Sequence, residues 1–295
     1  MKNLKCTYLL LCFMLTLPTL TGYAQEITEP KSPDSWKQAY EPFRIAGNLY
    51  YVGTYDLAAY LVTTDQGNIL INTGLATSAA QIRKSIEKLG FKYADIKILL
   101  TTQAHYDHVA AMAAIKKQTG AKLYVDEGDA DVLLSGGSTD YEMGRYGMTF
   151  APVRADKILH HKDTVSLGKT KLVMLHHPGH TKGSCSFLLD VKDSAKTYRV
   201  LIANLPSIIT DKNLDDVPGY PGIAKDYTFT FEGLKTVEFD LWVASHASQF
   251  DLHEKRKPGD AYDTSVFADR KLYEDKVQEL EVVFHKKMKE TYRFK

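Results

Sequence analysis

The chain contains 295 residues, of which 44% are hydrophobic and 25% are charged, and this composition suits a globular enzyme with one sizeable core. Its 37 basic and 36 acidic residues leave a formal net charge of +1. This balance excludes a strongly basic surface, so we expect neither nucleic acid nor an anionic membrane as a partner. We expect the protein to be a monomer.

The first 24 residues predict a secretory signal peptide. Two lysines precede an apolar stretch over residues 8–17, and a small-x-small cleavage site ends at Ala24. The apolar stretch is too short to span a bilayer, and no later stretch reaches that length. We therefore expect residues 25–295 to form a single domain that is exported to the periplasm.

Only one of the three cysteines, Cys185, lies beyond this leader. An exported domain with one cysteine has no internal disulfide, so its stability must come from core packing and bound metal. Cys185 lies in a strand-like run, where a small buried hydrophobe is the simplest interpretation. A metal ligand or a nucleophile is the alternative.

Patterns of apolar residues predict an α/β fold with mixed sheets. A polar, extended arm over residues 25–41 comes first, and one long loop without clear periodicity, rich in glycine, tyrosine and methionine, covers residues 135–156. We expect this loop to be an adaptable wall beside the functional site. The predicted strands are 49–52, 58–64, 69–72, 98–100, 123–125, 165–167, 171–176, 184–190, 198–203 and 241–244, with a hairpin turn at 65–68. The predicted helices are 78–89, 109–119, a short one ending at 134, 227–237 and an amphipathic one from 263 onward. Strands followed by helices in both halves favour this class over the other layered folds.

The densest cluster of chemically active residues lies between the strand 98–100 and the helix 109–119. It reads T-T-Q-A-H-Y-D-H from Thr101 to His108, and it places His105, Asp107 and His108 within four positions. Crowded imidazoles and a carboxylate would be costly to desolvate without a partner. The cluster therefore predicts a divalent metal site, with a solvated polar turn as the alternative.

Two further histidines follow the ends of predicted strands. His180 lies in the turn H-H-P-G-H-T, and His246 lies in A-S-H-A. A single histidine in such a place is usually structural. Three strand ends with histidines, one of them holding the dense cluster, favour a shared site.

The pattern Gln-x-His-x-Asp-His, then Pro-Gly-His-Thr, then a late His resembles the metallo-β-lactamases of subclass B3, and within them the GOB-type branch, which has Gln in place of the usual first His ligand. The resemblance covers nearly all of residues 25–295. It implies an αβ/βα sandwich with a zinc site at one edge between two mixed sheets. Carried over residue by residue, it implies one zinc site of Gln103, His105 and His180 and a second of Asp107, His108 and His246.

The same resemblance implies zinc-dependent hydrolysis of penicillins, cephalosporins and carbapenems. Two zinc ions lower the pKa of water from ~15.7 toward ~7 and so provide hydroxide at neutral pH. Asp107 would orient this nucleophile as well as bind metal, and Ser207 matches the serine that holds the substrate carboxylate. Leu205 stands where most members of the subclass have a serine. Because Gln103 offers only a neutral amide oxygen, we expect the Asp107, His108 and His246 site to bind zinc more tightly.

Three other functions have to be weighed. Thioesterases and lactonases of the same superfamily have a metal-bridging aspartate at the strand end that here reads Ala203-Asn204-Leu205, and this chain has no acid there. Ser85–Lys88 matches the S-x-x-K of serine β-lactamases, but neither of that family's other motifs is present. A non-catalytic exported zinc-binding protein would need the ligands but no substrate pocket.

Overall fold

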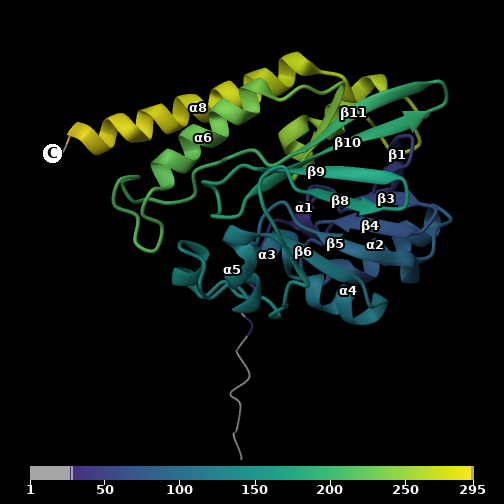
Figure 1. Ribbon diagram of the computed structural model, residues 1–295, viewed down its shortest axis with the longest axis horizontal. Coiled ribbons are helices and arrows are strands. Elements are labelled where there is room, and N and C mark those ends of the chain that lie inside the picture. The colour runs from purple at the N-terminus through teal and green to yellow at the C-terminus, as the bar shows by residue number, and fades with distance from the viewer. Residues whose placement is uncertain (1–26, 28, 294–295) are drawn as a thin grey trace, which may run out of the picture.

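Two facing β-sheets with helices on their outer sides make up the domain (Figure 1). The computed structural model describes residue 27 and residues 29–293, so the predicted leader 1–24 lies outside the described residues. This arrangement is the αβ/βα sandwich with two mixed sheets that the sequence predicts.

The first sheet has seven strands in the order of the chain. They are β1 (Phe43–Ala46), β2 (Leu49–Tyr51), β3 (Tyr60–Thr64), β4 (Gly67–Ile71), β5 (Ile96–Leu100), β6 (Lys122–Asp126) and β7 (Lys157–Leu159). Neighbours are antiparallel from β1 to β4 and parallel from β4 to β7. The predicted hairpin between β3 and β4 is confirmed, with Thr64 paired to Gly67.

The second sheet has five strands in the order β12-β11-β10-β9-β8. They are β8 (Thr164–Leu167), β9 (Thr170–His176), β10 (Cys185–Asp193), β11 (Lys196–Ala203) and β12 (Leu241–Ala244). The pairs from β8 to β11 are antiparallel, whereas β11 and β12 are parallel. The parallel pair places the ends of β11 and β12 at the same edge of the sheet.

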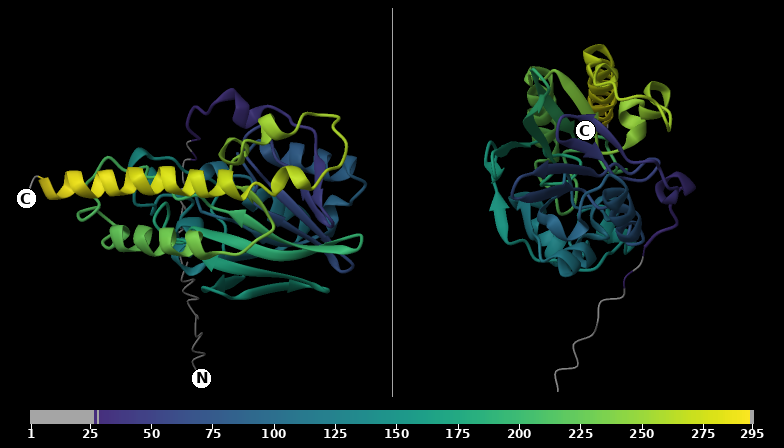
Figure 2. Two further views of the ribbon diagram at one scale, coloured as in Figure 1. Left: turned by 90° about the horizontal axis from the view of Figure 1, so that it is seen from above. Right: turned by 90° about the vertical axis from the view of Figure 1, so that its right-hand side faces the viewer.

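The helices divide between the two outer faces. They are α1 (Asp34–Lys37), α2 (Ser78–Lys88), α3 (Tyr106–Val109), α4 (Met112–Thr119), α5 (Ala130–Leu134), α6 (Ile223–Thr236), α7 (Leu252–Lys255) and α8 (Arg270–Arg293). Helices α2, α4 and α5 lie below the first sheet in Figure 1, and α6 and α8 run side by side above the second. Figure 2 shows both of these long helices from above, with α8 ending beyond the sheets.

The strands β3 and β4 at the centre of the first sheet are buried on both faces, which explains their nearly continuous apolar sequence. In β3, Tyr60 and Val62 pack in the core between the sheets, whereas Leu61 packs with the helices on the outer side. In β4, Ile69 packs between the sheets and Leu70 packs with the helices on the outer side. The alternation of side chains along a strand thus supplies two cores from one run of residues.

The single helix expected over residues 109–119 is wrong, because the structure has α3 and α4 with a break between them. The carbonyl of His108 accepts hydrogen bonds from the backbone N–H of Thr73 at 2.7 Å and from the Thr73 hydroxyl at 3.1 Å. That carbonyl would otherwise accept from Met112 within a continuous helix. A tertiary contact therefore ends α3 just after the dense cluster.

Two further expectations need correction. The arm over residues 25–41 is not extended throughout, because α1 lies within it. The loop 135–156 is not structureless, because Met143–Tyr146 forms a 3-10 turn and Asp140, Tyr141 and Glu142 are buried. Within the part of the chain that the structure describes, no helix combines the length and apolar character needed to cross a membrane.

Candidate metal centre

All six predicted metal ligands lie on loops that leave the ends of strands. Gln103, His105, Asp107 and His108 follow β5, and the last two are inside α3. His180 follows β9, and His246 follows β12. The ends of β5, β9 and β12 meet at one edge of the two sheets, so residues more than 140 positions apart form one cluster.

The first group contains His105 and His180. Their Nδ1 and Nε2 atoms face each other at 3.1 Å, and both side chains are buried. The amide oxygen of Gln103, on the same loop as His105, is buried without a hydrogen-bond partner among the described residues. A buried polar atom normally has a partner, and a metal ion could be the partner here.

The second group contains Asp107, His108 and His246, whose ligand atoms all lie within 4.8 Å of one another. The Oδ2 atom of Asp107 is 3.3 Å from Nε2 of His108 and 3.4 Å from Nε2 of His246. Both ring nitrogens of His108 are buried without a hydrogen-bond partner in the described part of the chain. This group therefore offers one carboxylate and two imidazoles to a common point.

The contacts that His180 and His246 make through Nδ1 determine what their Nε2 atoms, which face the other ligands, can bind. His180 Nδ1 donates to the carbonyl of Ser207 at 2.8 Å, which leaves Nε2 as an acceptor. His246 Nδ1 lies 3.2 Å from the Asp56 carboxylate and its Nε2 faces the carboxylate of Asp107, so both ring nitrogens face anionic oxygens. A proton or a metal ion must lie between atoms that face each other across 3.1–3.4 Å, and a metal ion can take the place of the proton.

These separations suit zinc. Two ligands bonded at 2.0–2.1 Å to a tetrahedral zinc ion stand about 3.3 Å apart, and the contacts in the two groups measure 3.1, 3.3 and 3.4 Å. Imidazole and carboxylate are also ligands that zinc accepts. The residues present therefore fit zinc.

The pKa values of the metal ligands depend on their burial and on the charges beside them. Burial disfavours the ionised form of Asp107, but the His108 and His246 imidazoles outweigh it and hold the pKa well below its ordinary value. Burial, together with the nearby His105, lowers the pKa of His180 to about 3. Burial opposes the charged form of His246, yet the carboxylates of Asp107 and Asp56 raise its pKa to about 9. A metal ion would replace the proton on His246.

Comparison with known proteins agrees with this geometry. Residues 54–193 match the metallo-beta-lactamase superfamily. The crystal structure of the metallo-β-lactamase GOB-18 from Elizabethkingia meningoseptica is 58% identical, covers 91% of this chain and 100% of its own, and superposes with a TM-score of 0.90. The class B3 di-zinc metallo-β-lactamase LRA-12 from an Alaskan soil metagenome is 60% identical over 89% of this chain and 100% of its own, with a TM-score of 0.87. The chain belongs to the metallo-β-lactamases of subclass B3.

A curated relative is more distant. The probable metallo-hydrolase YqgX of Bacillus subtilis is 26% identical over 143 residues, which are 48% of this chain and 64% of that protein. This chain therefore matches less than two thirds of the length of that relative.

One hydrogen-bonded network holds the two ligand loops of this subclass B3 chain together. The buried Asn72, which follows β4 with a positive φ of 62°, accepts from the backbone N–H of Thr102 at 2.9 Å. The Thr102 hydroxyl lies 2.9 Å from that of Ser245, the residue before His246. The ends of β4, β5 and β12 are thereby fixed relative to one another.

Two carboxylates that the sequence analysis did not single out contact the ligand rings. Asp140 Oδ2 lies 3.4 Å from His105 Nε2, and Asp56 Oδ2 lies 3.2 Å from His246 Nδ1. Such partners fix the orientation of metal-binding histidines. Neither acid is part of a motif, because its role depends on a contact made only in the folded chain.

The remaining histidines and the cysteine have structural contacts. His176 lies 2.7 Å from the Asp126 carboxylate, and His177 Nδ1 lies 2.8 Å from the Ser186 hydroxyl. His253 Nε2 lies 2.7 Å from the carbonyl of Tyr55, and its ring stacks on that tyrosine. Cys185 is buried on β10, and its thiol donates to the carbonyl of Thr101. The expectation of a small buried hydrophobe at position 185 is therefore confirmed.

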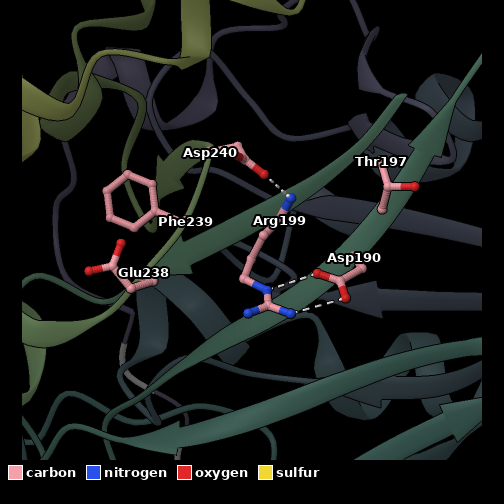
Figure 3. A pocket seen from close by; sticks show the side chains of 6 residues that line it. All are labelled: Asp190, Thr197, Arg199, Glu238, Phe239 and Asp240. Carbon is pink, nitrogen blue, oxygen red and sulfur yellow. Dashed lines mark hydrogen bonds and ion pairs between the residues drawn. The ribbon is translucent and has the colours of Figure 1, made fainter. Parts of the chain in front are cut away.

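A surface hollow away from the metal centre is lined by ion pairs. It lies against β10, β11 and the segment before β12 (Figure 3), and it is bordered by Asp190, Thr197, Arg199, Glu238, Phe239 and Asp240. The Arg199 side chain donates to both carboxylate oxygens of Asp190, at 2.9 and 3.3 Å, and its backbone N–H donates to Asp240. None of the residues that line the hollow is a predicted metal ligand, so the hollow adds nothing to the metal chemistry.

Proposed function

We propose that this protein opens the β-lactam ring of penicillins, cephalosporins and carbapenems with two zinc ions and so confers antibiotic resistance. The observation that carries the proposal is the pair of ligand groups at one sheet edge, each with ligand atoms that face one another. Gln103, His105 and His180 would hold one ion, and Asp107, His108 and His246 the other. When bound, the two ions would activate water at neutral pH and polarise the scissile carbonyl.

Asp107 has two tasks in this proposal. Its Oδ2 atom faces both histidines of the second group, which makes it a ligand. Its side chain is not completely enclosed, with 11% exposed, so a carboxylate oxygen can accept a hydrogen bond from the attacking water and orient it. No covalent intermediate with the protein is needed.

Ser207 is the residue that we propose for binding the substrate carboxylate. Its carbonyl already accepts from His180 Nδ1 at 2.8 Å and from the Tyr227 hydroxyl at 3.0 Å. Its own hydroxyl oxygen lies 3.2 Å from His180 Nδ1, and the hydroxyl hydrogen can turn outward to donate to a carboxylate. Ser207 would thus orient His180 through its backbone and bind substrate through its side chain.

The strand end after β11 argues against a thioesterase or a lactonase. Asn204 is buried there, and Leu205 packs in the core between the sheets. Neither residue offers the anionic oxygen with which those enzymes bridge two metal ions. The absence of an acid among these residues therefore favours a β-lactamase over a thioesterase or a lactonase.

The test is a panel of substrates offered to the purified, zinc-loaded protein. We expect rapid cleavage of a penicillin, a cephalosporin and a carbapenem, and no inhibition by clavulanate, which acylates catalytic serines. Efficient cleavage of thioesters or lactones with the β-lactams left intact would show that the proposed substrate class is wrong.

We further propose that the protein is exported to the periplasm as a monomer, with cleavage after Ala24. The lysines, the apolar stretch and the small residues of the leader support the export and the cleavage. N-terminal sequencing of the secreted protein and its mass in solution would test both statements.

A further inference from the structure

The N-terminal helix α1 lies against the second ligand group. The indole of Trp36 in α1 is half-buried, and its ring centre is 5.6 Å from that of His246. On another side it lies 6.2 Å from the ring of Tyr106, the residue before Asp107. Trp36 therefore contacts both loops that supply the second group.

Asp56 connects this helix to the metal ligand. Its Oδ2 atom accepts from the indole N–H of Trp36 at 3.0 Å and lies 3.2 Å from His246 Nδ1. Its Oδ1 atom accepts from the backbone N–H of Ser248 at 2.9 Å. Each oxygen of the carboxylate thus accepts from an N–H group other than the imidazole that it orients.

The backbone around Asp56 strengthens the connection. The N–H of Asp56 donates to the carbonyl of Ser35 in α1 at 3.2 Å, and the carbonyl of Asp56 accepts from Ala247 at 2.7 Å. Leu57 also pairs with His246 as an isolated bridge. Asp56 therefore joins α1 to the His246 loop through both its backbone and its side chain.

We propose that Trp36 is a positioning residue for the second metal site, which it supports by holding Asp56 against His246. A carboxylate whose two oxygens each accept from an N–H donor has little freedom to rotate away from the imidazole. The Nε2 atom of His246 then stays aimed at the point that Asp107 and His108 share. This inference rests on the proposed function only in taking that point as a zinc site.

Metal affinity measured without any substrate tests the proposal. Affinity for cobalt and zinc is determined by competition with a chromophoric chelator in the full-length protein. We expect Asp56→Ala to weaken the second site by roughly 10- to 100-fold. Trp36→Phe, which keeps a ring but removes the N–H donor, should weaken it by about threefold to tenfold. Asp56→Asn keeps the shape of the side chain, so its metal affinity should lie between those of Asp56→Ala and Trp36→Phe.

Trp242→Phe is the matched control. Trp242 is the other of the two tryptophans, and its indole donates to the carbonyl of Asp269 at 2.8 Å, outside the metal centre. This variant also loses one indole donor, and we expect its metal affinity to equal that of the parent. In it Trp36 is the sole tryptophan, so quenching of its fluorescence should follow the binding of cobalt to the second site.

A double-mutant cycle separates positioning from a general effect on folding. If Trp36 acts through Asp56, then Trp36→Phe should change the affinity by less than about twofold once Asp56→Ala is present. The visible spectrum of cobalt in the second site should change in Trp36→Phe and not in Trp242→Phe, whereas a purely structural loss would lower the melting temperature of the apo protein and leave the spectrum unaltered.

The proposal is overturned if Trp36→Phe binds metal as tightly as Trp242→Phe, or if the effects of Trp36→Phe and Asp56→Ala simply add. Both outcomes are independent of catalysis. A protein that leaves β-lactams intact yet shows the coupled loss of affinity would refute the proposed function and retain this inference.

Discussion

At the scale of single residues, the two proposed zinc sites differ in charge. Asp107, His108 and His246 offer one anion and two imidazoles, whereas Gln103, His105 and His180 offer two imidazoles and a neutral amide. Attraction between a carboxylate and a divalent ion is strong in a buried centre, and Asp107 is nearly enclosed. We therefore expect the two sites to fill in sequence.

A titration of the apo protein with cobalt should fill the Asp107 site first. Gln103→His should then strengthen the other site, because imidazole is a better zinc ligand than an amide oxygen. Visible spectra after the first and second equivalents report the order. Filling of the Gln103 side first, or an unchanged second affinity in Gln103→His, would contradict the unequal sites.

Removal of the Asp107 carboxylate should impair both metal binding and catalysis. Asp107→Ala removes a ligand and the group that we propose orients the water, so tight binding of metal and nearly all β-lactam hydrolysis should be lost. Metal content after dialysis and kcat/KM for a carbapenem check this. Asp126→Ala is a suitable control, because Asp126 is also buried but pairs with His176. Retained metal and activity in Asp107→Ala would exclude both roles.

Sequence patterns reveal the ligands better than the residues that orient them. His105, Asp107 and His108 are recognisable because three metal-binding side chains share four positions. Asp56 and His246 are separated by 190 positions, and an isolated aspartate in a loop carries no signal of a distant imidazole. Asp140 was inside the predicted loop, but its contact with His105 arises only when the chain folds.

At the scale of elements, the loop 135–156 has an anchored part and an exposed part. The buried Tyr141 donates to the carbonyl of His180 at 3.1 Å, and Asp140 lies beside His105. Tyr146, in contrast, has 57% of its surface exposed. The expected adaptable wall can therefore only be the outer part of the loop.

Substitutions in the two parts of this loop should have different effects. Tyr146→Ser should raise KM for bulky β-lactams by removing an exposed apolar contact, with the zinc content unchanged. Asp140→Asn should instead weaken metal binding to the first site by roughly tenfold, because the partner of His105 loses its charge. Steady-state kinetics and metal competition distinguish the two, and a loss of zinc in Tyr146→Ser would show that the exposed part is structural.

Long periodic elements were predictable, and so were some short strands, but not all. The helix expected over 78–89 and the strands around β3 to β5 occur as α2 (Ser78–Lys88) and in the first sheet. The strands β1 and β7 were not predicted, because each is short and includes a basic residue, Arg44 or Lys157, that interrupts the apolar pattern. The break before α4 depends on the contact between Thr73 and His108, which local sequence does not encode.

At the scale of the whole molecule, packing in the core between the two sheets fixes the relative positions of the ligand loops. Phe187 on β10 is buried in this core, and its strand also pairs with β9, which leads to His180. Phe187→Ala should lower the free energy of unfolding by about 3–5 kcal/mol. Denaturant unfolding measures this, with Val282→Ala on the exposed face of α8 as the control. Equal stability of the two variants would contradict a packed interior at this position.

Zinc-dependent hydrolysis of a carbapenem is the most direct test of the central claim. The purified protein is stripped with a chelator, and zinc is returned in steps while hydrolysis and zinc content are measured together. The account predicts no hydrolysis by the apo protein and a rate that returns as the sites fill. Undiminished hydrolysis without zinc, or an intact carbapenem with both sites filled, would contradict it.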